Sequence, residues 1–470
     1  MSLPRVMQPW GSPASAWELR AILTWVTWGC AGLFLLAIQV PVVLATESET
    51  VTKALQRLYD KQEYQKIVEE IGKLSSDQAA VADVRRIKIR SLLRIGKPKE
   101  ALAEYDRLEH GVKQDETVLL REVALGFVLV MMKDMREQMR GVAYTALKDW
   151  QSPEAVPFLE DGLSDGSGLV RALAAEGLAK LEEGRRSARF RQALDDQASL
   201  VKEAVLKGLG KSGDASVVAL AEPVIQDPEV RVRVAAAEVL CRFGRTHGCE
   251  SLRQSGRSPN PDERTAAIRA LVDLQGGQTL SVLIEASQHT QPSVRGAAAM
   301  GLGHVPKPEA VAALTRLLKD PLPPVRVVAV VSLGQLRGLD TVSPLREAIE
   351  DPDASVRAFA VGSLLEQGER FDAVAAAIPA LSNTKEPAVR AALARALGRA
   401  SEGNRQAVRA VLGSLLADTI PRVRISAIKS IAKLDGMDAV PILKKSLHDE
   451  DDAVRAAAGG ELLHTMLVRK

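Results

Sequence analysis

Residues 170–181 read VRALAAEGLAKL, and variants of this string recur along the rest of the chain. Copies include VRVAAAEVLCRF at 232–243, VRGAAAMGLGHV at 294–305 and VRAALARALGRA at 389–400. Self-similarity at a fixed spacing is typical of a repeat architecture. The basic residue after the valine gives the register of eleven units, and eight of the ten steps between them are 31 residues. These basic residues are Arg140, Arg171, Lys202, Arg233, Arg264, Arg295, Arg326, Arg357, Arg390, Arg424 and Arg455.

Each unit places particular side-chain types at fixed offsets from its basic residue. A large aliphatic residue follows seven positions later in every unit, and an alanine follows three positions later in nine units. At about 100° per residue these positions lie on one stripe of a helix, which we expect to be buried. The small alanine lets neighbouring helices approach closely. The aliphatic residues are Leu147, Leu178, Leu209, Leu240, Leu271, Leu302, Leu333, Leu364, Leu397, Ile431 and Leu462.

An aspartate stands six residues before the basic residue in eight of the eleven units, and proline follows it at Asp227 and Asp351. This arrangement predicts a helix N-terminus with aspartate as the cap and proline in the first turn. A second, less regular helix fills the rest of each unit, as in residues 309–320 and 438–449. We therefore expect an all-α solenoid over residues 133–470, with a concave surface lined by the second helices.

Two helices per 31 residues, with the pattern D-x-x-x-x-V-R before a closing L-G, resemble HEAT repeats of the short type found in bilin lyases. The resemblance implies that aspartate and arginine form hydrogen-bonded ladders between adjacent units, so the arginines are structural. Ser258, His289 and Thr384 replace the aspartate, and the ladder is expected to weaken there. The ladder residues singled out are Asp165, Arg171, Asp227, Arg233, Asp351 and Arg357.

Residues 46–132 form a separate segment that is rich in helix-forming residues. The strings LYDKQEYQKIVEEIGKL at 58–74 and LLRIGKPKEALAEYDRL at 92–108 align at an offset of 34 residues, so that Gln62 matches Gly96. This period resembles tetratricopeptide repeats, and it implies a turn at Gly96 between paired helices. Two repeats are too few for independent stability, so we expect them to stack on the solenoid.

The N-terminal segment, residues 1–45, contains an uncharged apolar run at 21–45, AILTWVTWGCAGLFLLAIQVPVVLA. Arginines precede the run and glutamates follow it, which places the rest of the chain outside the cytoplasm. Val43 and Ala45 match the small residues of a signal-peptidase site and predict cleavage after Ala45. The run is also long enough to span a bilayer, so an uncleaved anchor is the alternative, and a buried core helix is a third.

Cys241 and Cys249 are expected at the end of a first helix and at the start of the second helix of the same unit. A hairpin brings such positions near one another, and an oxidising compartment would allow a disulfide. Two separately packed cysteines remain an alternative. A metal site with His247 is another, although one Cys-x5-His-x-Cys string is weak evidence for metal.

The densest basic cluster lies in EEGRRSARFRQALDD at 182–196. On a second helix it could bind an acidic partner or anionic lipid. The acidic residues of the same string favour a solvated, neutralised face instead. The arginines of this cluster are Arg185, Arg186, Arg189 and Arg191.

Composition and motifs argue against several function classes. The formal net charge of +3 and the 3% of aromatic residues do not form the basic, aromatic surface of a nucleic-acid binder. None of the six histidines is followed by glutamate, so the His-Glu pairs that hold iron in deoxyhypusine-hydroxylase-like enzymes are missing. No residue stands out as a bilin site. We expect no cofactor, no metal and no catalytic residue.

These observations favour a bacterial, non-catalytic scaffold that binds a protein or peptide partner on its solenoid surface. It is expected outside the cytoplasm, as a periplasmic or secreted protein, or anchored in the inner membrane by residues 21–45. An accessory enzyme or lyase subunit related to the bilin lyases is the alternative, because the same scaffold carries many functions.

Overall fold

The computed structural model describes residues 49–111, 116–275 and 279–467, and all regular structure in these ranges is helical. No helix in these ranges is long and apolar enough to cross a membrane. The predicted signal or anchor at 21–45, with its cleavage position after Ala45, lies outside the described residues.

The chain divides into two compact units. The first contains residues up to Ile95 together with Ala103–Gln114, and the second contains Gly96–Leu102 and all residues from Asp115 onward. Helix α5 (Pro98–Gly111) therefore contributes to both units.

The first unit contains helical residues 49–60 and three short helices over a small apolar core. Gln62 and Gly96 both adopt left-handed backbone angles, with φ of 61° and 75°, and each follows the end of a helix. The tetratricopeptide assignment stays a prediction. The helices are α2 (Tyr64–Gly72), α3 (Ser76–Ala80) and α4 (Ala82–Arg94), and the core side chains are Leu55, Ile67, Ile71, Val84 and Ile87.

In the described part of the second unit, eleven helices carry the repeated basic residue, which is preceded by valine in nine of them, and they are here called the first helices. Their predicted buried stripe is confirmed, because the aliphatic residue at offset seven is at most 4% exposed in every unit. The residue at offset three, usually alanine, is 0% exposed throughout. The first helices are α7 (Glu137–Trp150), α9 (Gly168–Lys180), α12 (Ser199–Gly210), α14 (Val230–Arg242), α16 (Pro261–Gln275), α18 (Pro292–Leu302), α20 (Pro323–Gln335), α22 (Ala354–Gln367), α24 (Pro387–Leu397), α26 (Pro421–Asp435) and α28 (Asp452–Leu467).

The second helices are shorter and less regular than the first ones, as the sequence predicts. Several are preceded or followed by a single 3-10 turn, and the second helix after α9 is broken into α10 and α11 at Ser187. They are α8 (Val156–Gly162), α10 (Glu182–Arg186), α11 (Ala188–Gln192), α13 (Val217–Ala221), α15 (Thr246–Ser255), α17 (Leu280–Ala286), α19 (Pro308–Leu317), α21 (Val342–Glu347), α23 (Ile378–Ser382), α25 (Arg405–Leu415) and α27 (Val440–Ser446).

The repeated aspartates do not cap the first helices, and that prediction is wrong. Helix α14 begins at Val230, three residues after Asp227, and Glu229 occupies the cap position. Asp227 instead accepts a hydrogen bond of 2.8 Å from the Glu229 N–H and closes a turn ahead of the helix. Its other carboxylate oxygen is left for the basic residue of the preceding unit, and Lys202 Nζ lies 3.4 Å away.

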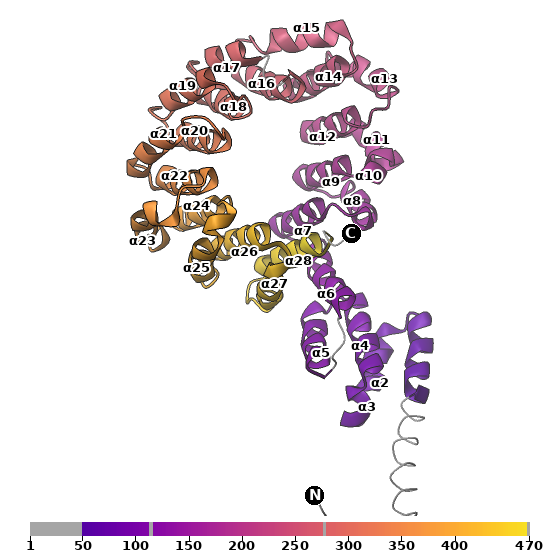
Figure 1. Cartoon of the computed structure of the whole chain (residues 1–470). Helices are drawn as coiled ribbons and strands as arrows, with labels where there is room; N and C mark the ends of the chain where they lie inside the picture. Colours follow the sequence, from indigo (N-terminus) through magenta and orange to yellow (C-terminus); the bar gives the residue numbers. More distant parts are fainter. Residues whose placement is uncertain (1–48, 112–115, 276–278, 468–470) are drawn as a thin grey trace, which may run out of the picture. The chain divides into compact units, whose positions relative to one another are not determined.

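The last first helix, α28, packs on α26 and also on α7 and α6 (Thr117–Met131), so the array of repeats closes into a ring. Figure 1 shows α28 between α26 and α7. A Cβ on Gly460 would lie 2.6 Å from the Ala146 Cβ of α7. In the ordinary junction between α22 and α24, Gly362 and Ala396 occupy the same two repeat positions and also meet. The ring therefore closes through the packing used between consecutive repeats.

Helix α6 packs beside α28 in the position that a second helix takes beside a first helix. It packs on α28 and then leads into α7, as each second helix leads into the next first helix. A Cβ on Gly459 would lie 2.6 Å from the Ala124 carbonyl oxygen of α6. Helix α6, from before the array, and helix α28, its last first helix, thus form one repeat together, here called the composite repeat. Helix α6 falls within the predicted 46–132 segment, but it packs with the second unit because much of its surface is apolar and buried.

Candidate interaction surface

The inner face of the ring is formed by the first helices, and the second helices lie on the outside (Figure 1). The prediction that second helices line the concave surface is therefore wrong. Consecutive first helices are in broad contact because their alanines and glycines allow close approach, whereas second helices contact one another little. The first helices are spaced more closely than the second helices, so they form the shorter, inner arc of the ring. Since the other sides of a first helix are packed, its exposed side chains face the opening.

An apolar pocket of about 400 Å³ lies at the seam, where the last repeats meet the first ones. Helices α7, α9, α26 and α28 contribute to its walls. Leu169 is 51% exposed, which is unusual for so large an aliphatic side chain on a helix. The apolar lining residues are Val142, Leu169, Leu173, Ile425 and Ala457.

Charged groups border this pocket and connect the two sides of the seam. Lys429 Nζ of α26 lies 3.3 Å from an Asp149 carboxylate oxygen of α7 and 3.8 Å from Glu461 of α28. Lys180 of α9 lies 3.6 Å from the same aspartate. Burial raises the pKa of the Glu461 carboxyl, and the positive charge of Lys429 opposes that shift. Four first helices, α26, α28, α7 and α9, are thus joined by charge at the seam.

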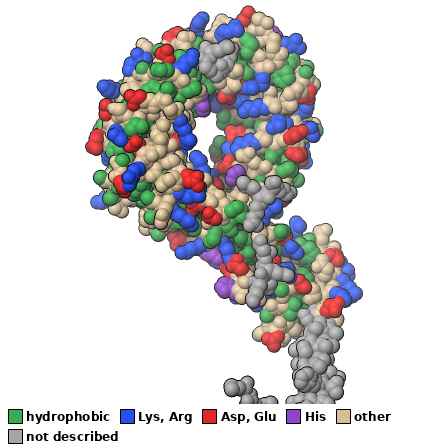
Figure 2. Space-filling model, in the orientation of Figure 1, with side chains coloured by type: hydrophobic (Ala, Val, Ile, Leu, Met, Phe, Trp, Pro, Cys, Tyr) green, Lys and Arg blue, Asp and Glu red, His purple; other side chains and the backbone are tan. Residues whose placement is uncertain are grey.

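Two arginines extend the surface on one side of the pocket, on α24 and α26. Arg395 and Arg422 are exposed, and neither has an acidic partner within salt-bridge distance in the described part of the chain. The guanidinium of Arg395 is only partly shielded from solvent, and this desolvation lowers its pKa, as does the neighbouring charge of Arg422. Figure 2 shows Lys and Arg side chains among those around the opening of the ring. An acidic group would relieve this uncompensated charge.

The basic cluster singled out in the sequence is neutralised by acidic neighbours. Arg186 pairs with Glu182, Arg189 lies 3.4 Å from Asp161, and Arg191 lies 2.8 Å from Asp214. The remaining member, Arg185, donates to the Ala179 carbonyl at 2.9 Å. These contacts match the neutralised alternative, in which the cluster is a structural part of the second helices α10 and α11.

The ladder arginines bind the aspartate of the following unit and not the one of their own unit. Arg171 donates from Nε and Nη2 to Asp196, while Asp165 receives the same two bonds from Arg140. Arg357 reaches only the backbone carbonyls of Asp351 and Pro352, because Thr384 stands where its aspartate would be. Asp351 accepts from Arg326 and Asp227 from Lys202, whereas among the described residues Arg233 donates to backbone carbonyls and to no other side chain.

A family model for HEAT repeats matches the chain five times, at residues 124–205, 187–272, 249–326, 280–366 and 374–462. This chain belongs to the HEAT-repeat family. The matched segments begin within α6 and end within α28, so the two helices of the composite repeat lie at the borders of the HEAT matches.

Solved structures similar to this HEAT protein include three helical proteins of low identity. Human deoxyhypusine hydroxylase in complex with glycerol is 21% identical and covers 68% of this chain and 98% of its own, with a TM-score of 0.30. The Escherichia coli protein YibA is 18% identical, with coverages of 61% and 94% and a TM-score of 0.32. A mutant of Kap121p is 14% identical, with coverages of 86% and 54% and a TM-score of 0.36. No curated protein matches. These TM-scores are too low to support an inference about function.

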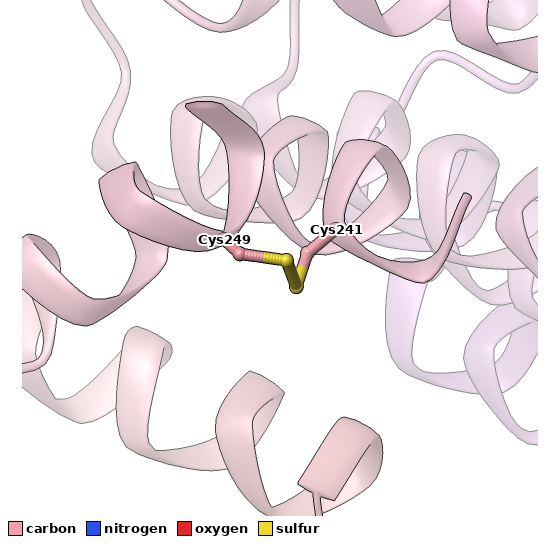
Figure 3. Close-up of a disulfide and its surroundings, with 2 residues drawn as sticks. All are labelled: Cys241 and Cys249. Carbon is pink, nitrogen blue, oxygen red and sulfur yellow. A yellow bond between two sulfur atoms is a disulfide. The ribbon is translucent and has the colours of Figure 1, made fainter. Parts of the chain in front are cut away.

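The two cysteines of the second unit are bonded in this HEAT protein. Cys241 lies in α14 and Cys249 in α15, and their Sγ atoms form a disulfide within one helical hairpin (Figure 3). The imidazole of His247 lies 3.0 Å from the Glu222 carboxylate. In the described part of the chain, no group of three or more His, Cys, Asp or Glu residues is placed to hold a metal ion.

Sequence reasoning missed the seam pocket, because its walls come from units at opposite ends of the HEAT array. One signal was present in the sequence. The last unit reads VRAAAGGELLHT and has adjacent glycines, Gly459 and Gly460, where they approach α6 and α7. In addition, the apolar segment 117–131 precedes the first unit.

Proposed function

We propose that this chain is a non-catalytic scaffold outside the cytoplasm and that it binds an extended protein or peptide segment on the inner face of its ring. The seam pocket carries this proposal, since it is an apolar concavity with an exposed leucine on a face otherwise rich in polar side chains. Pockets that combine an apolar floor with a few charged groups are typical binding sites. The uncompensated Arg395 and Arg422 beside it favour a partner with acidic residues.

Two features support the proposed location. The apolar run at 21–45 with basic residues on its N-terminal side favours export or anchoring. A disulfide between Cys241 and Cys249 would persist in an oxidising compartment and would be reduced in most cytoplasms. Fractionation with N-terminal sequencing tests this part of the proposal. A chain that begins at Thr46, or an intact chain in the membrane fraction, supports export, and an intact soluble cytoplasmic chain contradicts it.

Peptide selection tests the binding role. Peptides selected from a random library against the wild-type protein should bind the Leu169→Asp variant at least about tenfold more weakly, because one anchor residue at an interface is commonly worth 1.4 kcal/mol or more. Val118→Asp is the matched control, because Val118 is 68% exposed on α6 and is outside the pocket. Peptides that bind both variants equally well would place the binding surface elsewhere, and failure to select any peptide would contradict the scaffold role.

A further inference from the structure

Six of the ladder arginines show how an arginine at this repeat position binds a carboxylate, and Arg233 can be compared with them. In each, Nε donates to one oxygen of the next unit's aspartate at 2.5–2.8 Å, and Nη2 donates to the other at 2.7–3.0 Å. The remaining nitrogen, Nη1, donates to backbone carbonyls at the start of its own first helix, as Arg295 does to His289 and Thr290. This anchoring fixes the guanidinium so that one edge receives a carboxylate in a bidentate manner. The six are Arg140, Arg171, Arg295, Arg326, Arg390 and Arg424.

Arg233 keeps this anchoring and lacks the carboxylate. Its Nη1 donates to the carbonyls of Asp227 at 2.9 Å and Pro228 at 2.8 Å. Ser258 stands at the aspartate position, and its Oγ accepts the Asn260 N–H at 3.2 Å, so the turn is preserved. Serine has no carboxylate for the preceding arginine, and among the described residues Nε and Nη2 of Arg233 donate no hydrogen bond.

Glu263 does not replace the missing aspartate. Its nearest carboxylate oxygen lies 3.7 Å from Arg233 Nη2, well beyond the ~2.7–2.9 Å of a charge-assisted hydrogen bond. The two oxygens of Glu263 accept hydrogen bonds from Ser255 at 2.9 Å and Ser258 at 2.8 Å, which hold it in this position. The binding edge of Arg233 therefore remains open.

A pocket of about 750 Å³ lies beside this edge. Arg253 and Arg257 line it together with Arg233, and both are exposed and have no acidic partner among the described residues. The lining contains two carboxylates, Glu250 and Glu263, against these three guanidinium groups. The pocket thus has an excess of positive charge beside Ser258, the position where the ladder lacks an aspartate.

The walls of this pocket are held together covalently. Arg233 belongs to α14 and Arg253 to α15, and the Cys241–Cys249 disulfide joins these two helices. The two helices that carry these arginines are thus held together before a ligand binds, which favours binding.

From this internal comparison we propose that the pocket binds a ligand with more than one carboxylate, one of which takes the place of the missing ladder aspartate on Arg233. The other carboxylate meets Arg253 and Arg257. The ligand is either a small free dicarboxylate or an acidic segment of a peptide, since both offer the same group to the arginine. This site is separate from the seam pocket and does not depend on the function proposed for it.

Calorimetric titration at constant ionic strength tests the site and separates the two sources. The probes are succinate and the acetylated, amidated tripeptide Asp-Glu-Asp, with Asn-Gln-Asn as the neutral control peptide. Saturable binding of at least one acidic probe, and none of the neutral peptide, is expected for the wild type. Stronger binding of succinate indicates a free dicarboxylate, and stronger binding of the acidic tripeptide indicates a peptide. Failure of both acidic probes to bind overturns the proposal.

Two pairs of variants locate the binding. Ser258→Asp supplies the missing carboxylate and should weaken the acidic probe at least about tenfold, the equivalent of losing one hydrogen bond to a charged group. Thr384→Asp is its matched control, because it adds the same charge at the gap next to Arg357. Arg253→Gln should also weaken binding, whereas Lys319→Gln, at an exposed lysine outside the pocket, should not. Equal binding by Ser258→Asp and wild type, or equal losses in a variant and its control, would refute the site.

Discussion

At the scale of single residues, the ladder couples the fold to pH. The hydrogen bonds from Arg171 lower the pKa of the Asp196 carboxyl. A carboxyl with a lowered pKa in the folded state stabilises the fold at pH values above its unfolded pKa of about 3.9. This contribution is lost as the pH falls through the lower folded pKa. The Arg171–Asp196 pair therefore stabilises the fold at neutral pH and loses this contribution in acid.

Asp196→Asn should lower the stability at neutral pH by about 1–3 kcal/mol, because the amide carries no negative charge and keeps only one oxygen to accept the two hydrogen bonds from Arg171. The variant should also lose less stability than the wild type between pH 5 and pH 2, a window of about three units set by the carboxyl titration. Urea unfolding at several pH values measures both effects. Asp195→Asn is the control, since Asp195 is exposed and makes no ion pair among the described residues. Equal acid sensitivity of Asp196→Asn and wild type would contradict this prediction.

The buried stripe allows a second prediction at this scale. Leu302 is 0% exposed, so Leu302→Ala should cost about 2–5 kcal/mol through lost burial and the cavity that it leaves. Leu322 is 41% exposed, and Leu322→Ala should change stability by less than about 0.5 kcal/mol. Hydrogen exchange should show the Leu302→Ala effect mainly in α18 and the repeats that contact it. Uniform loosening of the whole ring would argue against nearest-neighbour stability.

At the scale of helices, the first helices could be predicted from the sequence and their arrangement in space could not. The alanine and leucine offsets identify the buried stripe because burial selects side-chain size locally, and every one of these residues is buried. The same periodicity does not state which of the two helices forms the inner layer. Ring closure could not be predicted from the sequence either, because it depends on small rotations between neighbouring repeats, summed over all of them. Of the candidate site residues, those of the ladder were implied by the resemblance to HEAT repeats, whereas the seam pocket exists only because of closure.

The composite repeat gives a prediction at the scale of helices. Gly460→Leu should force α28 away from α7, because even a Cβ there would lie 2.6 Å from the Ala146 Cβ. The expected cost is roughly 1–3 kcal/mol of overpacking. Amide exchange should rise in α28, α7 and α6 and stay unchanged in α18. Gly296→Leu is the control, since a Cβ on this helical glycine meets nothing within 4 Å. Equal exchange in the two variants would mean that the seam tolerates the added side chain.

For the whole molecule, closure means that the second unit has no terminal repeat in its folded state. Open solenoids need end repeats with a polar outer face to stay soluble. Helix α6 has no such face, because it buries Leu120, Val123 and Phe127 among others and packs on α28. The solubility of the unit therefore depends on the pairing of its two ends.

A chain that ends at Asp451 tests this dependence. Without α28, the apolar side of α6 is expected to be exposed, so the protein should bind a hydrophobic dye and self-associate in sedimentation experiments. A truncation that removes only the residues after Leu467 is the control, because it keeps α28 whole. A monomeric, dye-free protein lacking α28 would show that closure is dispensable for solubility.

The composite repeat also bears on how the protein is made. The ribosome synthesises α6 before any of the ring's first helices, and it synthesises α28 after all of them. Domains commonly begin to fold during synthesis, yet α28, the partner of α6, emerges only after all the other first helices. Through most of translation, and through export if the chain is exported, α6 offers its apolar side to whatever chaperone is present. The ring can close only once synthesis has passed α28, and a chain released before that point keeps a surface that quality-control proteases can recognise.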